Sequence, residues 1–120
     1  MVTQPVPFGY SRFPLEWKET LGQLSRLDFD TLVPGHGEVQ QGKDYVRSLM
    51  SLLQSVQDQV RAGVAAGLDL EAVRGKVDLS EFVQRFAVDD AVNRYYFHEY
   101  FTVPNVERTF NALKTKAGQK

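Results

Sequence analysis

One short β-favouring segment among helical ones restricts the possible folds of this chain more than any other feature. Asp30 to Val33 favours a strand, and the turn sequence Pro34-Gly35-His36-Gly37 follows it directly. Proline has no N–H to give to a ladder and ends the strand, while glycines permit positive φ and close backbone approach. Because a lone strand leaves its backbone groups unpaired, the sequence predicts a pairing partner in missing sequence or in another chain.

The other apolar residues recur at helical spacing, which predicts a mainly α-helical chain of about six helices and one strand. Pro14 begins a helix that ends near Leu27, and Asp44 caps a long helix that ends at a left-handed Gly67. The apolar stripe of the long helix comprises Tyr45, Leu49, Leu52, Leu53, Val56 and Val60. Asp69 is expected to cap a short helix that runs to Val73, and Asp78 with Glu81 three residues later resembles a capping box for a helix that runs to Phe86. Two more helices are expected, one from Asp89 or Asp90 through the aromatic cluster Tyr95 to Phe101, and one from Pro104 to Leu113 before a frayed tail from Lys114.

Composition excludes several classes of function. The chain has no cysteine, so it forms neither a disulfide nor a thiolate zinc site. Its 14 Lys and Arg residues nearly balance 15 Asp and Glu residues, and no basic stripe favours nucleic acid or an anionic membrane. No apolar run approaches the ~20 residues that span a bilayer, and no signal peptide is visible. We therefore expect a cytoplasmic protein with no nucleic-acid partner and no membrane partner.

The segment Leu27 to Gly37 resembles the C-terminal metal-ligand motif of the metallo-β-lactamase-fold hydrolases. In that family a strand runs into a Pro-Gly-His-Gly turn, and the histidine binds the second metal of a dinuclear site. The resemblance implies that His36 is a metal ligand and that Pro34, Gly35 and Gly37 form the loop that supports it. It also implies zinc, usually as two ions, with iron or manganese as the other metals that suit histidine ligands.

The main signature of that family, a His-x-His-x-Asp-His loop, occurs nowhere in the 120 residues, and neither does its bridging aspartate. The resemblance therefore implies the C-terminal fragment of an αββα sandwich. Residues 1–42 would end the metallo-β-lactamase domain, and residues 43–120 would form a helical cap. The expected partner is the missing N-terminal part of the same fold. Alone, the chain would contain no catalytic residue, retain no metal and be inactive.

Other hypotheses remain open. The chain would also suit a stand-alone helical interaction module without catalysis, or a module that self-associates into a homo-oligomer. The second histidine, His98, falls in an aromatic helix and is interpreted as a packed or surface residue. Asp28, Asp30 and Glu38 flank the strand and turn and are interpreted as solvated groups. Whether the chain belongs to an enzyme is therefore not decided by its residues alone.

Overall fold

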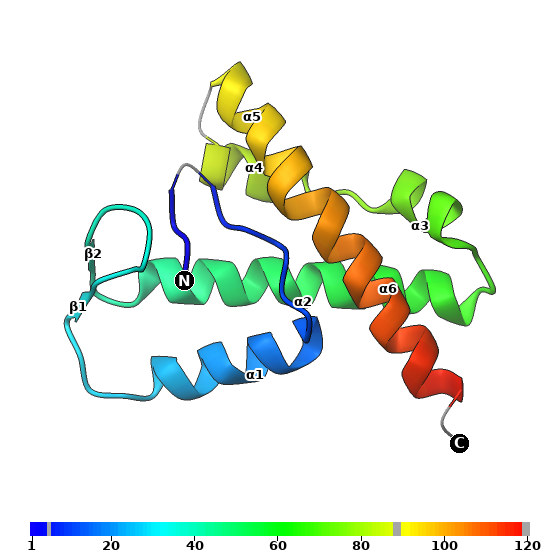
Figure 1. Cartoon of the computed structure of the whole chain (residues 1–120), viewed down its shortest axis with the longest axis horizontal. Coiled ribbons are helices and arrows are strands. Elements are labelled where there is room, and N and C mark those ends of the chain that lie inside the picture. The colour runs from blue at the N-terminus through cyan, green and yellow to red at the C-terminus, as the bar shows by residue number, and fades with distance from the viewer. Residues whose placement is uncertain (5, 88–89, 119–120) are drawn as a thin grey trace.

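The computed structural model describes residues 1–4, 6–87 and 90–118, with side chains up to residue 116. Within these residues the chain is mainly helical, as predicted, with six α-helices, one π-helical turn and two short strands (Figure 1). The elements in chain order are α1 (Pro14–Ser25), β1 (Thr31–Leu32), β2 (Gln40–Gln41), α2 (Asp44–Ala65), α3 (Leu70–Lys76), α4 (Ser80–Ala87), α5 (Ala91–Phe97), the π-helical turn η1 (His98–Thr102) and α6 (Val103–Gly118).

The long helix α2 forms the centre of the molecule. Figure 1 shows α1 running alongside α2 and α6 crossing it, and both helices contact α2. The aliphatic residues of the predicted stripe are all buried, with at most 1% of their surface exposed. They are Leu49, Leu52, Leu53, Val56 and Val60. The helical periodicity of the sequence therefore identified the core correctly.

The prediction of a single strand is wrong. The strand ends at Leu32, two residues before Pro34, which has no N–H to give to a ladder. It pairs antiparallel with a second strand that the sequence did not suggest. Leu32 pairs with Gln40, and Thr31 with Gln41. Two glutamines carry no β-favouring pattern, so the register depends on the intervening turn and not on propensity. The strand thus finds a pairing partner inside the chain.

The end of α2 is fixed by two glycines for different reasons. Gly67 has a φ of +76°, as predicted, and its N–H donates to the Val64 carbonyl at 3.0 Å. The Leu68 N–H donates to the Gly63 carbonyl at 3.0 Å, which completes a Schellman motif. Gly63 itself lies against α3, where an added Cβ would come within 2.7 Å of a Val73 methyl group. The small residue therefore permits the close approach of α3.

Two of the predicted helix starts differ in their capping. Asp69 caps α3 as predicted, because its side chain accepts from the Ala72 N–H at 2.9 Å. Asp44, in contrast, is the first residue of α2 and not its cap; Lys43 takes the cap position without a side-chain hydrogen bond. The carboxylate of Asp44 still lies at the positive end of the helix dipole.

The predicted capping box at α4 forms differently. Asp78 accepts hydrogen bonds from the backbone and hydroxyl of Ser80, which lower the pKa of the Asp78 carboxyl. The Asp78 N–H, which Glu81 was expected to bind, donates instead to Gln59 of α2 at 2.8 Å. Gln59 also donates to the Asp78 carbonyl at 2.9 Å. A tertiary contact has therefore replaced a local one.

The last two predicted helices are continuous. Helices α5, η1 and α6 follow one another without a break, and α6 continues to Gly118 where fraying from Lys114 was expected. Asp90 caps α5, whereas Asp89 lies outside the described residues. None of the helices in the described ranges is both long and apolar enough to cross a membrane.

Pro104 explains the π-helical turn. Proline has no N–H, so Pro104 cannot donate to the Tyr100 carbonyl four residues earlier. Gly9 supplies the missing donor, because its N–H lies 2.7 Å from that carbonyl oxygen. The turn widens beside the proline, and the Val103 N–H donates to His98 five residues earlier. The N-terminal segment, defined here as residues 1–4 and 6–10, is thereby attached to the helical tail.

Substitution of Gly9 tests this attachment. An added Cβ would lie 2.3 Å from the Phe101 carbonyl oxygen and 2.7 Å from the Asn105 Cβ. We expect Gly9→Ala to lower the free energy of unfolding by about 2 kcal/mol, measured by urea denaturation. Gly75→Ala is the matched control, because nothing lies within 4 Å of its added Cβ. An equal effect of both substitutions would contradict the close approach at Gly9.

Tyr45 gives the fold a dependence on alkaline pH. Burial raises the pKa of the Tyr45 hydroxyl above its ordinary value of 10.0. The unfolded chain therefore releases this proton first, so the stability that the neutral hydroxyl contributes is present below pH 10 and is lost as the pH rises above it. Between about pH 10 and pH 11, wild type should lose up to about 1 kcal/mol more unfolding free energy than Tyr45→Phe.

The matched control for Tyr45 is Tyr95→Phe, since Tyr95 is 61% exposed. Urea denaturation of the three proteins across this pH range measures the difference. The interpretation is wrong if wild type, Tyr45→Phe and Tyr95→Phe all lose the same unfolding free energy as the pH rises.

Candidate functional site

His36 lies in the turn between β1 and β2 and is held by the N-terminal segment. Its backbone pairs with Val2 in a parallel bridge, and the Thr3 N–H donates to the His36 carbonyl at 2.9 Å. The Gly35 N–H donates to the Met1 carbonyl at 3.0 Å. These hydrogen bonds join residues more than thirty positions apart, so the turn is fixed by a distant segment.

The imidazole of His36 is oriented by one hydrogen bond. Its Nδ1 atom lies 2.7 Å from the carbonyl oxygen of Gln4. A carbonyl only accepts, so in the neutral ring Nδ1 carries the proton and Nε2 keeps its lone pair. The side chain is exposed, and this lone pair is available to a ligand. Histidines that bind metals usually donate their second ring N–H to a carbonyl or carboxylate in the same manner.

Gln4 holds both sides of the turn. Its backbone carbonyl accepts from the His36 ring, and its side-chain oxygen accepts from the Glu38 N–H at 2.6 Å. No local pattern in the sequence marks Gln4, because its partners lie 32 and 34 residues away. Gln4 is therefore a site residue that sequence reasoning missed.

The two glycines around His36 have different roles. Gly37 has a φ of +121°, and an added Cβ would lie 2.1 Å from the Thr3 hydroxyl and 2.9 Å from the Gln4 nitrogen. Gly35 does not have positive φ, and its added Cβ would meet only the Met1 carbonyl at 3.7 Å. Of the pair, Gly37 alone requires glycine for its backbone conformation and for the close approach of the N-terminal segment.

His36 does not belong to a cluster of potential metal ligands among the described residues. No group of three or more histidine, cysteine or carboxylate side chains there is placed to hold a metal ion. Glu38 follows the turn and is exposed, and Asp30 is held at the strand start, where its carbonyl accepts from Gly42. His98 is exposed at the start of η1. The structure thus presents a single oriented histidine.

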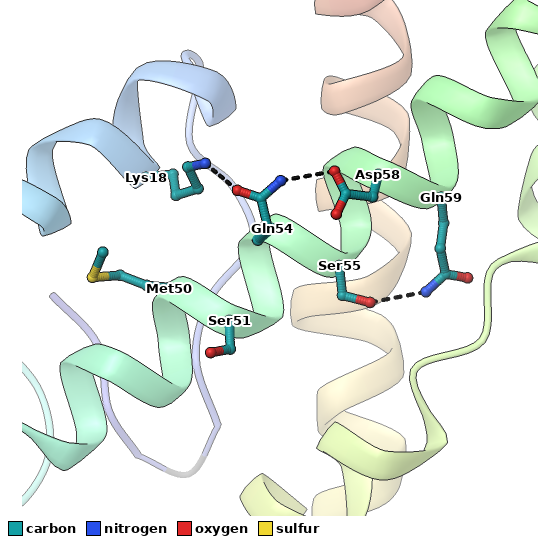
Figure 2. A pocket seen from close by; sticks show the side chains of 7 residues that line it. All are labelled: Lys18, Met50, Ser51, Gln54, Ser55, Asp58 and Gln59. Atoms are coloured by element: carbon teal, nitrogen blue, oxygen red, sulfur yellow. Dashed lines mark hydrogen bonds between the residues drawn. The ribbon is translucent and has the colours of Figure 1, made fainter.

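A groove of about 510 Å³ between α1 and α2 is lined mostly by polar residues (Figure 2). Lys18 of α1 donates to Gln54 of α2, whose amide donates to Asp58 at 2.7 Å. Gln59 donates to the Ser55 hydroxyl at 3.0 Å. These hydrogen bonds pair most of the polar side chains that line the groove, and no histidine lines it to activate its hydroxyls. The groove therefore holds α1 on α2 and provides no nucleophile.

Replacing Gly37 and Gly35 in turn distinguishes the roles of the two glycines. We expect Gly37→Ala to lower the free energy of unfolding by about 2 kcal/mol, because alanine disfavours positive φ and its Cβ displaces Thr3. Gly35→Ala should change it by less than about 0.5 kcal/mol. In ¹⁵N spectra of the His36 ring, wild type and Gly35→Ala should show the Nδ1-protonated tautomer, and Gly37→Ala a mixture. Identical spectra for all three would refute the role of Gln4.

The sequence matches no protein-family model and no curated protein.

Proposed function

We propose that this chain is the C-terminal portion of a metal-dependent hydrolase of the metallo-β-lactamase fold. In this proposal His36 supplies one metal ligand, and the helical tail of residues 43–120 caps the site. One observation carries the proposal: the Pro-Gly-His-Gly turn presents the Nε2 lone pair outward while the Gln4 carbonyl, 2.7 Å away, fixes Nδ1. The arrangement supports the proposal because a metal-binding histidine usually donates its other ring N–H to a carbonyl or a carboxylate.

The donor set fits one ligand of a metal and not a complete site. A catalytic zinc ion takes three protein ligands or more, whereas the described residues bring one histidine to the turn. The remaining ligands belong, in this proposal, to the N-terminal part of the same fold. Zinc, as two ions, suits a histidine site best, with iron or manganese as alternatives. The chain alone is expected neither to retain the metal nor to hydrolyse a substrate.

The chemistry would be hydrolysis of a carbonyl, thioester or phosphoester bond. A bound metal pair would lower the pKa of a water molecule and polarise the bond to be broken. The residues of this chain contribute orientation. Gln4 fixes the ring of His36, and Gly37 lets the segment that bears Gln4 approach the turn. Such fixed ligands lower the cost of ordering the site. We place this hydrolase in the cytoplasm, which suits a chain without cysteine.

A second candidate is a stand-alone or self-associating helical module without catalysis. The observation that favours it is the core, which α1, α2 and α6 build from residues of this chain alone. Apolar side chains around the hairpin would supply a contact surface, since Leu27, Val33 and Val39 are 58%, 73% and 50% exposed. The two candidates differ in whether metal and hydrolytic activity accompany the complete gene product.

The test is metal content and hydrolysis by the complete gene product, with and without His36→Ala. Metal is measured by elemental analysis, and activity with a panel of thioester, lactone, β-lactam and phosphoester substrates. We expect bound zinc in wild type, and in His36→Ala the loss of part of the metal and about 100-fold or more of the activity.

The matched control is His98→Ala, which removes the other histidine and should leave metal content and activity unchanged. Hydrolysis that survives His36→Ala would overturn the role of His36. A cooperatively folded gene product without metal or hydrolysis would favour the helical module.

A further inference from the structure

A cavity of about 750 Å³ lies between the start of α1 and α6, two helices that contact each other. Three of the residues that line it are cationic: Arg12 precedes α1, and Arg108 and Lys116 lie on α6. Glu16 is the one carboxylate of the lining, so the cavity has a formal charge of +2 in a chain of net charge −1. The lining of the cavity therefore carries an excess of positive charge.

These cations are not neutralised by the rest of the described structure. Among the side chains of residues 1–4, 6–87 and 90–116, neither Arg12 nor Arg108 nor Lys116 forms a salt bridge, whereas four other arginines do. Arg108 is held in place, because it donates to the Tyr10 carbonyl and its guanidinium lies 5.3 Å from the centre of the Tyr10 ring. A guanidinium already ordered by the fold loses less entropy when it binds an anion.

The lining combines this charge with apolar surface. Phe13 is 60% exposed, and the Arg12 guanidinium lies 5.6 Å from the centre of its ring. Pro14, Leu15 and Ala112 contribute further apolar atoms, and Asn111 and Thr115 add polar groups. The first turn of α1 has no side-chain cap, so its positive end adds to the potential of the cations. An aromatic ring beside clustered cations suits a ligand that is anionic at one end and apolar at the other.

We propose that this cavity binds a small amphiphilic anion, a phosphate or carboxylate joined to an aromatic group. The anionic head would lie among Arg12, Arg108 and Lys116, and the aromatic group against Phe13. The cavity is separate from His36, because α1 has twelve residues, about 18 Å of helix, and the turn between β1 and β2 follows its opposite end (Figure 1). The proposal is thus independent of the metal-ligand role of His36.

Phenyl phosphate is the probe that tests this site. Titration is followed by ¹H–¹⁵N NMR of the full chain, and the amides of Leu15, Glu16 and Thr115 should shift saturably. The double variant Arg12→Gln/Lys116→Gln removes two exposed cations and should weaken binding about tenfold. The matched control is Lys114→Gln, which removes a cation of the same helix that does not line the cavity and should leave the affinity unchanged.

Inorganic phosphate and Phe13→Ala test the apolar half of the site. Inorganic phosphate should bind several-fold more weakly than phenyl phosphate, and Phe13→Ala should remove most of that difference in affinity. The ¹H–¹⁵N spectrum of Phe13→Ala should match that of wild type away from the cavity, which shows that the fold is intact. The proposal is overturned if phenyl phosphate causes no saturable shift at these amides. It is also overturned if the double variant and Lys114→Gln bind equally, or if the two phosphates bind equally to wild type.

Discussion

The hydrogen bond from Gly9 to Tyr100 is the constraint on which the arrangement of this chain depends. An extended segment must satisfy its backbone groups somewhere, and a helix that contains proline leaves one carbonyl without a donor. Here the Gly9 N–H donates to the Tyr100 carbonyl at an N–O distance of 2.7 Å, so both backbone groups have a partner. Val6 lies fully buried between these fixed ends of the N-terminal segment. The segment is thereby integrated into the core, although it forms no helix and only one bridge.

The candidate site inherits its geometry from that segment. The ring of His36 is oriented by Gln4, and the turn closes on Thr3 and Gln4 because Gly37 offers no side chain. A hairpin whose strands have two residues each would not by itself hold such a turn in place, since isolated hairpins are only marginally stable. Precise placement of the imidazole therefore comes from residues before α1, while the helical tail fixes the segment that carries them.

Structural features that depend on residues close together in the chain could be predicted from the sequence, whereas those that depend on distant partners could not. The stripe of α2, the left-handed Gly67 and the cap at Asp69 follow from spacing within a few residues, and the structure contains them. The strand Gln40–Gln41 and the hydrogen bonds of Gln4 depend on partners that no local pattern specifies. Pro104 was expected to begin a new helix, but a donor from Gly9 allowed the helix to continue. His36 could be picked out from the sequence as a candidate metal ligand, whereas the hydrogen bond between its ring and Gln4 could not be predicted.

The attachment at Gly9 also has a consequence for the order of assembly during synthesis. The bond between the His36 ring and Gln4 joins residues 32 positions apart, so the two partners leave the ribosome within a short interval of each other. Arg108, which donates to Tyr10 across 98 positions, leaves the ribosome long after Tyr10 does. Contacts of such separation carry the larger cost of loop closure. The turn that bears the histidine can therefore form on the nascent chain, but it is locked to the helical tail only when α6 is complete.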